Sequence, residues 1–319
     1  MQRGPETLTL TEEDLAFYRL SCDLFPALES PLRFLDEEDI EPDDVEAAVG
    51  SLEERGLLNP TGSGASQDVL DRLTPVSECS ARVTLTVHGP VSTTRDFYLA
   101  ADGGVEYRCD GAAHTFGPLR NETALAVELA QHFKPAAEPA PRGVRLSASD
   151  YLVFAVFARD VRQSSEPTNG EAPMSVDEVL SYFDEAETKV VRTPSDETWV
   201  TSIATLTSSG VLVESKNGYT MHPNLHAVAR EIVADHEHTV TRFDFLDEHW
   251  LMREVSLYPT GEAVYRLGTE PDGAVLIEEL SIASLADVLA SVVGTLPNLL
   301  NPEAPPSFRH PKMGGRVPF

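Results

Sequence analysis

The sequence repeats itself once, and this repeat constrains the fold more than any other feature. In the first half "AVGSLEERGLL" corresponds to "SIATLTSSGVL" in the second, with Leu52 and Gly56 matching Leu206 and Gly210 at an offset of about 154 residues. Apolar residues at helical spacing followed by glycine predict an amphipathic helix that ends where the chain turns left-handed. We therefore predict that Gly56 and Gly210 are structural helix stops.

The correspondence continues through three further elements in the same order. "SARVTLTVHG" matches "EHTVTRFDFL", and both show the alternation of a half-buried strand. "RDFYLAADGGVEYRCDG" matches "REVSLYPTGEAVYRLGTEPDG", each a strand, a turn with glycine and a strand. "NETALAVELAQHF" matches "SIASLADVLASVVGTL", each an amphipathic helix. Each half also opens with a helix at a capping signal, "LTEEDLAFYRL" and "LSASDYLVFAVF", and five elements in one order predict a duplicated chain.

We predict an α+β fold made of two similar halves related by a pseudo-two-fold axis. Each half is a winged-helix-like helical subdomain, an antiparallel β-meander of three or four strands and a closing helix. "GVLVESKNGYTMHP" supports the wing, because Asn217-Gly218 is a strong two-residue hairpin signal. Each half opens at a pair with capping-box spacing, Thr11 with Asp14 and Ser147 with Asp150. Since isolated meanders expose unpaired edges, we expect the two to form one larger antiparallel sheet.

The predicted division of the chain follows its proline-rich segments. The first half covers residues 1–143 and ends in the linker "KPAAEPAPRG". The second half covers residues 144–300 and carries an inserted loop at 163–173. A Pro/Gly-rich tail covers residues 301–319.

Charge argues against nucleic acid as the partner. The chain holds 24 basic and 52 acidic residues, a formal net charge of −28. Binding to nucleic acid depends on clustered Lys and Arg that displace counterions from phosphates. Only four lysines occur, and the helix that would face DNA, in "VEAAVGSLEERGLL", carries three glutamates and one arginine. We therefore expect no binding to duplex DNA.

The sequence also predicts a cytoplasmic protein that is a monomer or a weak dimer. The segment "MQRGPETLTL" lacks the apolar core of a signal peptide, and the run "YLVFAVFA" is too short to span a bilayer. Three cysteines without close spacing indicate free thiols in a reducing compartment.

No motif for catalysis, a cofactor or a metal stands out. His222 and His226 lie four residues apart, but Pro223 is expected to begin the helix, which leaves His222 as its cap. "TGSGAS" lacks the glycines and lysine of a phosphate loop, and "FLDEEDIEPDD" lacks the EF-hand pattern. No serine stands in a nucleophile elbow. We expect a protein that is not an enzyme, holds no cofactor or metal and acts through its surface.

The tail is the one basic and aromatic segment of an otherwise acidic chain. After Glu303 it carries no acidic residue, and it is a candidate to dock on the acidic body or on an acidic partner. The candidate contact residues in this tail are Phe308, Arg309, His310, Lys312 and Arg316.

The order of elements resembles the EspG family, the cytosolic chaperones of type VII (ESX) secretion. In the first half, "AVGSLEERGLLNP", "DVLDRLTPVSECSARVTLTV" and "TALAVELAQHF" carry the likeness, which extends over about 290 residues as element order. The resemblance implies a pseudo-two-fold protein without enzymatic activity that keeps an aggregation-prone secretion substrate soluble. It also implies that the end of a helical substrate is held by a sheet loop and a helical bundle. The strong acidity and the basic tail depart from this pattern.

Two other classes of protein remain open from the sequence. An immunity or decoy protein could use its acidity to meet a basic toxin or a nucleic-acid-binding protein. A winged-helix regulator with a ligand-sensing domain would need basic residues on its wing, where only Lys216 occurs. The sequence favours a chaperone or adaptor that binds a protein partner.

Overall fold

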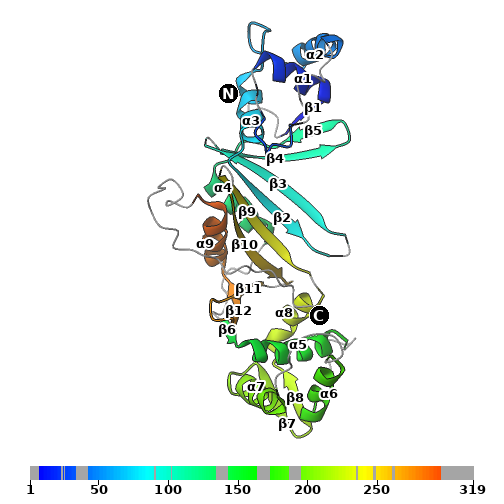
Figure 1. The fold of residues 1–319 in the computed structure, drawn as a ribbon, viewed down its shortest axis with the longest axis vertical. Coiled ribbons are helices and arrows are strands. Elements are labelled where there is room, and N and C mark those ends of the chain that lie inside the picture. Colours follow the sequence, from blue (N-terminus) through cyan, green and yellow to red (C-terminus); the bar gives the residue numbers. More distant parts are fainter. Residues whose placement is uncertain are drawn as a thin grey trace. The chain divides into compact units, whose positions relative to one another are not determined.

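The chain folds as an α+β protein around a large antiparallel sheet (Figure 1). The structure is a computed structural model of the full chain. It describes residues 7–22, 24, 26–33, 42–89, 91–101, 103–133, 143–163, 173–186, 195–234, 236–246, 249–260 and 263–295. The predicted linker, the inserted loop at 163–173 and the tail at 301–319 lie almost wholly outside these residues.

In the described residues, the first part of the chain begins with a short strand and three helices, and four consecutive strands and a closing helix follow. In chain order its elements are β1 (Leu8–Leu10), α1 (Glu12–Ser21), α2 (Pro42–Glu54), α3 (Gln67–Ser77), β2 (Ala81–Val87), β3 (Thr93–Ala100), β4 (Gly103–Asp110), β5 (Ala113–Phe116) and α4 (Glu122–Phe133). Helix α1 begins at the predicted capping box: Asp14 N–H donates to Thr11 Oγ1 at 3.2 Å, and Thr11 N–H donates to the Asp14 carboxylate at 3.0 Å.

The second part of the chain follows the same general order with more helices before its strands. Its elements are β6 (Gly143–Leu146), α5 (Ala148–Gln163), α6 (Val176–Ala186), α7 (Asp196–Ser208), β7 (Leu212–Ser215), β8 (Gly218–Met221), the short 3₁₀ helix η2 (Pro223–Leu225), α8 (His226–Val233), β9 (His238–Leu246), β10 (His249–Pro259), β11 (Val264–Thr269), β12 (Val275–Leu280) and α9 (Ile282–Val293). Helix α5 also begins at its predicted cap, where Asp150 N–H donates to Ser147 Oγ at 3.2 Å.

The large sheet has ten strands in the order β1-β5-β4-β3-β2-β9-β10-β11-β12-β6. This confirms that the strands of the two meanders join in one antiparallel sheet. The joining ladder runs from Ala81 opposite Asp244 to Val87 opposite His238, with Thr84 opposite Thr241 at its centre. Strands β1 and β6, each next to the last strand of a meander, are too short for the sequence pattern to have predicted them.

Contacts divide the residues into two compact units that each combine separate stretches of the chain. The first unit contains residues 1–132, 238–255 and 285–294, and the second contains the remainder. A core that includes Leu15, Leu52 and Leu73 lies in the first unit. A core that includes Phe154, Trp199 and Leu206 lies in the second.

The predicted hairpin at "ESKNGY" is present as β7 and β8, but its turn is shifted by one residue. Ser215 pairs with Gly218, so the two residues between the strands are Lys216 and Asn217 and not Asn217-Gly218. Gly218 instead begins β8 with φ of +136°, and a β-carbon there would come within 2.3 Å of the Met174 carbonyl oxygen. Close approach of another backbone thus explains this glycine.

Both predicted helix-stop glycines are left-handed, with φ of +67° at Gly56 and +74° at Gly210. After α2, Leu57 N–H donates to the Leu52 carbonyl at 2.9 Å, and Val211 N–H donates in the same way to Leu206 at 2.9 Å after α7. These are the bonds of a Schellman ending, which satisfies carbonyls that the helix leaves without partners.

Candidate partner-binding site

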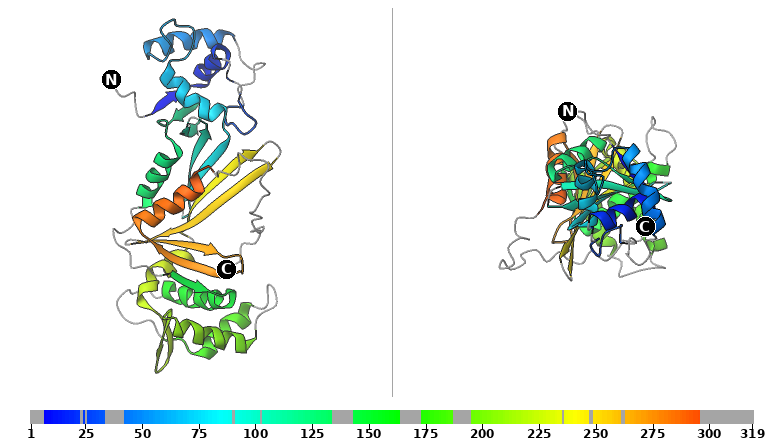
Figure 2. Two further views of the ribbon diagram at one scale, coloured as in Figure 1. Left: turned by 90° about the vertical axis from the view of Figure 1, so that its left-hand side faces the viewer. Right: turned by 90° about the horizontal axis from the view of Figure 1, so that it is seen from above.

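Buried charges attach one face of the sheet to α4 and α9, the helices that Figure 2 shows side by side. Arg242 of β9 donates to Asp244 at 2.7 Å and to Glu122 of α4 at 2.7 Å. Arg253 of β10 donates to Asp244 at 3.1 Å and to the Ser291 carbonyl of α9 at 2.7 Å. Burial lowers the pKa of Arg253, which the neighbouring Asp244 opposes. Since arginine stays charged, this network fixes the last turn of α9 on the sheet.

The opposite face of the sheet carries a row of polar side chains on its four central strands, β3, β2, β9 and β10. Thr84 Oγ1 donates to Asp96 of β3 at 2.6 Å, and Thr241 Oγ1 donates to Glu254 of β10 at 3.1 Å. Thr84 and Thr241 are themselves directly opposite each other. Each carboxylate therefore has a hydroxyl partner. From either end, the row consists of a carboxylate, two threonines and a second carboxylate.

An apolar patch lies on this second face, where β9 and β10 form a hairpin. We define it as Phe243, Phe245, Trp250 and Met252. The Trp250 ring meets Phe243 and Phe245 edge to face, with centroids 6.4 Å and 6.1 Å apart. Nevertheless Trp250 is 67 % exposed and Met252 is 50 % exposed. Exposed aromatic and methionine side chains on one face of a sheet are typical of protein-binding surfaces.

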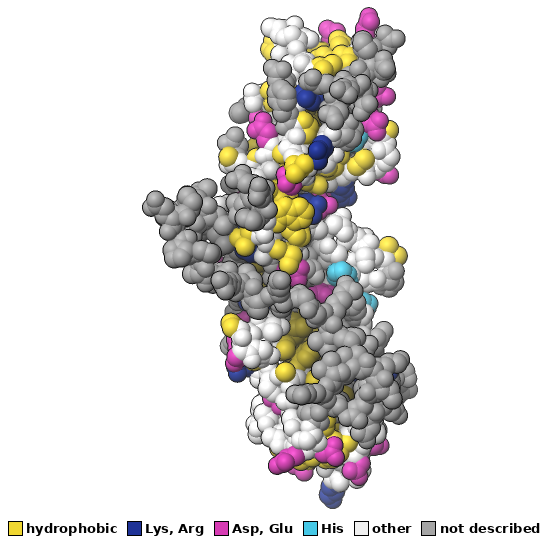
Figure 3. All heavy atoms as spheres, viewed as in Figure 1, with side chains coloured by type: hydrophobic (Ala, Val, Ile, Leu, Met, Phe, Trp, Pro, Cys, Tyr) yellow, Lys and Arg dark blue, Asp and Glu magenta, His cyan; other side chains and the backbone are white. Residues whose placement is uncertain are grey.

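One cation lies at the edge of the apolar patch. The Arg82 guanidinium lies 5.2 Å from the centroid of the Phe243 ring, directly across the β2–β9 ladder. The positive charge over the ring face stabilises the orientation of Phe243. Figure 3 shows that acidic side chains outnumber basic ones on the face of the molecule that it draws.

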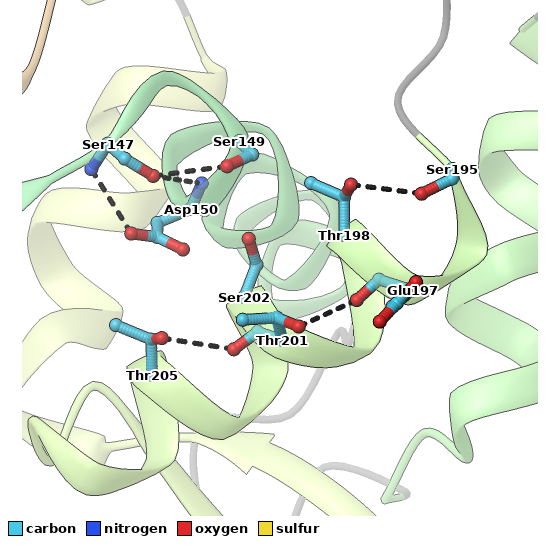
Figure 4. A pocket seen from close by; sticks show the side chains of 9 residues that line it. All are labelled: Ser147, Ser149, Asp150, Ser195, Glu197, Thr198, Thr201, Ser202 and Thr205. Atoms are coloured by element: carbon cyan, nitrogen blue, oxygen red, sulfur yellow. Dashed lines mark hydrogen bonds between the residues drawn. The ribbon is translucent and has the colours of Figure 1, made fainter.

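A polar pocket between α5 and α7 is a second, weaker candidate (Figure 4). It is an open hollow of about 400 Å³, and its lining residues are Ser147, Ser149, Asp150, Ser195, Glu197, Thr198, Thr201, Ser202 and Thr205. This lining contains no basic side chain to attract an anion. Several of the hydroxyls are already used within the helices: Thr201 donates to the Glu197 carbonyl at 2.7 Å and Thr205 to the Thr201 carbonyl at 3.0 Å.

His222, one of the two histidines that lie four residues apart, is the N-terminal cap of η2. His222 precedes η2, and its Nδ1 accepts from Asn224 N–H at 3.2 Å, while His226 bonds to the Met221 carbonyl at 3.0 Å. Within the described residues, no three His, Cys, Asp or Glu side chains are placed to hold a metal ion. None of the helices in that part of the chain has the length and apolarity that crossing a bilayer requires.

The candidate tail residues, from Phe308 to Arg316, lie outside the described residues, so their docking stays a prediction. The apolar patch was missed by sequence reasoning, although a signal for it exists. Comparison of the two matched hairpins sets "TVHG" beside "FDFL" and "VSTT" beside "HWLM". At the four patch positions the first hairpin has Thr86, His88, Ser92 and Thr94, so the two hairpins differ in polarity at these positions.

No protein-family model matches the chain, and no curated protein matches it. Among solved structures, the chain is similar to the type VII secretion system chaperone EspG5 of Mycobacterium tuberculosis, solved in complex with the PE25-PPE41 dimer. The match has a TM-score of 0.50 and 12% sequence identity, and it covers 91% of this chain and 97% of the EspG5 chain. At this identity the likeness concerns the fold, which is EspG-like over nearly the whole chain.

Proposed function

We propose that this protein is a cytoplasmic chaperone or adaptor that binds a secreted protein and shields its aggregation-prone surface. The observation that carries the proposal is the fold match to EspG5 over nearly the full length of both chains. EspG5 was solved with a bound protein dimer, which supports a protein partner for this chain as well. The proposed role involves no enzymatic step, no cofactor or metal, no nucleic acid and no membrane.

The proposal includes an internal duplication, with winged-helix-like helical subdomains in both halves. The strand order of the large sheet supports it, because β1 to β5 on one side of the central ladder mirror β6 and β9 to β12 on the other. Equivalent side chains also bond equivalent helices: Arg95 of β3 contacts Glu128 of α4 at 3.0 Å, and Arg253 of β10 donates to Ser291 of α9. A duplicated scaffold offers two related surfaces that can differ in what they bind.

The test is recovery of the partner from the native cytosol by affinity capture of the tagged full-length chain, followed by mass spectrometry. We expect one abundant secreted-type protein at a fixed ratio to the chain. That protein, produced alone, should aggregate, and it should stay in solution when the chain is produced with it. Recovery of a basic toxin or a nucleic-acid-binding protein would instead favour the acidic decoy, which the net charge of −28 makes the second candidate. If no protein is enriched over an unrelated acidic control, the chaperone proposal is wrong.

A further inference from the structure

Two members of the apolar patch, Trp250 and Met252, are exposed and are not required by the fold, whereas Phe245 packs against the core of the first unit. The matching hydrogen bonds of Thr84 with Asp96 and Thr241 with Glu254 align the β2–β3 hairpin with the β9–β10 hairpin. In this alignment the positions of the four patch residues are taken on the β2–β3 hairpin by Thr86, His88, Ser92 and Thr94. The same hairpin geometry thus forms with polar side chains.

The exposed Trp250 and Met252 side chains have polar residues as counterparts on the β2–β3 hairpin, so their exposure needs a reason other than folding. The partial exposure of Trp250 and Met252 leaves apolar area in contact with water, and a partner that covers it gains about 25 cal/mol for each Å². Two aromatic rings hold Trp250 in place, so little side-chain entropy is lost when a partner covers it. Both properties are typical of residues that dominate the binding energy of an interface.

The charges near the apolar patch indicate the chemistry of its partner. Glu254, which is exposed, follows Met252 on the same face of β10, and the chain as a whole carries a formal net charge of −28. Arg82 is a cation beside the patch, and it is held over the Phe243 ring. A partner segment with Lys or Arg beside its apolar residues would therefore be attracted, and an acidic one repelled.

The dimensions of the patch fit one side of a helix. Neighbouring strands lie about 5 Å apart, and alternate residues on a strand lie about 7 Å apart. A helix with its side chains is about 10 Å in diameter. Its apolar face can therefore cover side chains on two neighbouring strands over this distance. We propose that the apolar patch binds a cationic amphipathic helix of the protein partner. This inference rests on the proposed function and locates the binding surface.

Fluorescence tests this proposal directly, because Trp250 is 67 % exposed and Trp199, the other tryptophan, is 2 % exposed. The full-length protein is titrated with a synthetic amphipathic helix of Leu and Lys, and separately with the same peptide in which Glu replaces Lys. The Leu/Lys peptide should shift the Trp250 emission to shorter wavelength and protect it from acrylamide. The Leu/Glu peptide should do neither. Equal binding of both peptides would overturn the proposal.

Two matched variants separate apolar contact from general attraction of a cationic peptide to an acidic protein. Met252→Ser removes apolar surface without a change of charge and keeps Trp250, and it should weaken binding of the Leu/Lys peptide by about tenfold. Val91→Ser, at a residue that is 79 % exposed beside the β2–β3 hairpin, should leave binding unchanged. Unchanged melting curves show that both variants fold. If Met252→Ser binds as the wild type does, the patch is not the binding surface.

Two further results distinguish this inference from the proposed function. A captured native partner that binds Met252→Ser and Trp250→Ala as tightly as the wild type would overturn the patch and leave the chaperone role intact. Failure to capture any partner would defeat the chaperone role, whereas a Met252-dependent titration would still support the surface.

Deletion of residues 302–319 is the last experiment. If the deletion alone shifts Trp250 emission without peptide, the occupant is the chain's own basic tail and the partner assignment is wrong.

Discussion

Two glycines of one helix segment should respond to alanine with opposite signs. Gly50 lies inside α2, and Gly56 follows its end with φ of +67°. Nothing lies within 4 Å of a β-carbon built on either residue, so steric clash contributes at neither position. Backbone conformation alone then decides the outcome. Gly50→Ala should stabilise by about 0.5–1 kcal/mol, because alanine loses less entropy in a helix.

At Gly56 the same methyl group should destabilise the protein. Left-handed backbone costs an L-residue about 1–2 kcal/mol, against which the stiffer unfolded chain returns about 0.4–1 kcal/mol. The expected loss is about 1 kcal/mol, and Gly210→Ala should behave alike with its φ of +74°. Gly218→Ala should lose more than either, since its β-carbon would meet the Met174 backbone.

Urea unfolding followed by circular dichroism measures all four variants against the wild type. The informative quantity is the midpoint at constant m-value, since a change in m would indicate a changed unfolded state. A neutral or stabilising Gly56→Ala would refute the helix-stop assignment and remove the clearest matched pair from the duplication. A destabilising Gly50→Ala would show that crowding or strain acts where the structure shows open space.

Three other predictions follow from buried groups. Asp244→Ala should destabilise by about 3–5 kcal/mol in urea unfolding, because it leaves two buried arginines without their shared carboxylate; a loss below about 1 kcal/mol would contradict a buried network. Burial lowers the pKa of His114 from 6.5, so the unfolded chain binds the proton more readily than the folded chain does, and the stability should fall as the pH drops below about 6.5. His114→Phe should flatten this part of the profile of stability against pH. A variant with the same profile as the wild type would contradict the role of His114. Burial raises the pKa of the Cys79 thiol to about 11, so iodoacetamide at pH 8 should label exposed Cys109 in the folded protein and spare Cys79 until denaturant is added; equal labelling before denaturation would show that Cys79 is accessible.

The elements that sequence reasoning found are those with local signals. Thr11 and Ser147 begin their helices where the capping pattern predicts, and Gly56 and Gly210 have the left-handed backbone expected after α2 and α7. Strand β1 gave no usable signal, because three residues are too few for alternation to be recognised. Its position is set by its pairing with β5, far along the chain.

The chemistry of the sheet faces could not be read from the alternation in β9. Polar side chains are expected to face water, yet Arg242 and Asp244 are buried and Phe243, between them, lies on the face of the exposed Trp250. The exception arises because Arg242 and Asp244 satisfy each other and Arg242 also bonds the last turn of α9. Such compensation depends on residues about 50 positions away, beyond the reach of a local pattern.

The central ladder, with Thr84 opposite Thr241, has a consequence for how this architecture can diversify. Two identical chains paired in this way would form a symmetric dimer, in which every substitution appears twice and every surface has a copy. Within a single chain, each half can mutate alone. Under the proposed duplication, one hairpin can then gain an apolar surface while its counterpart stays polar.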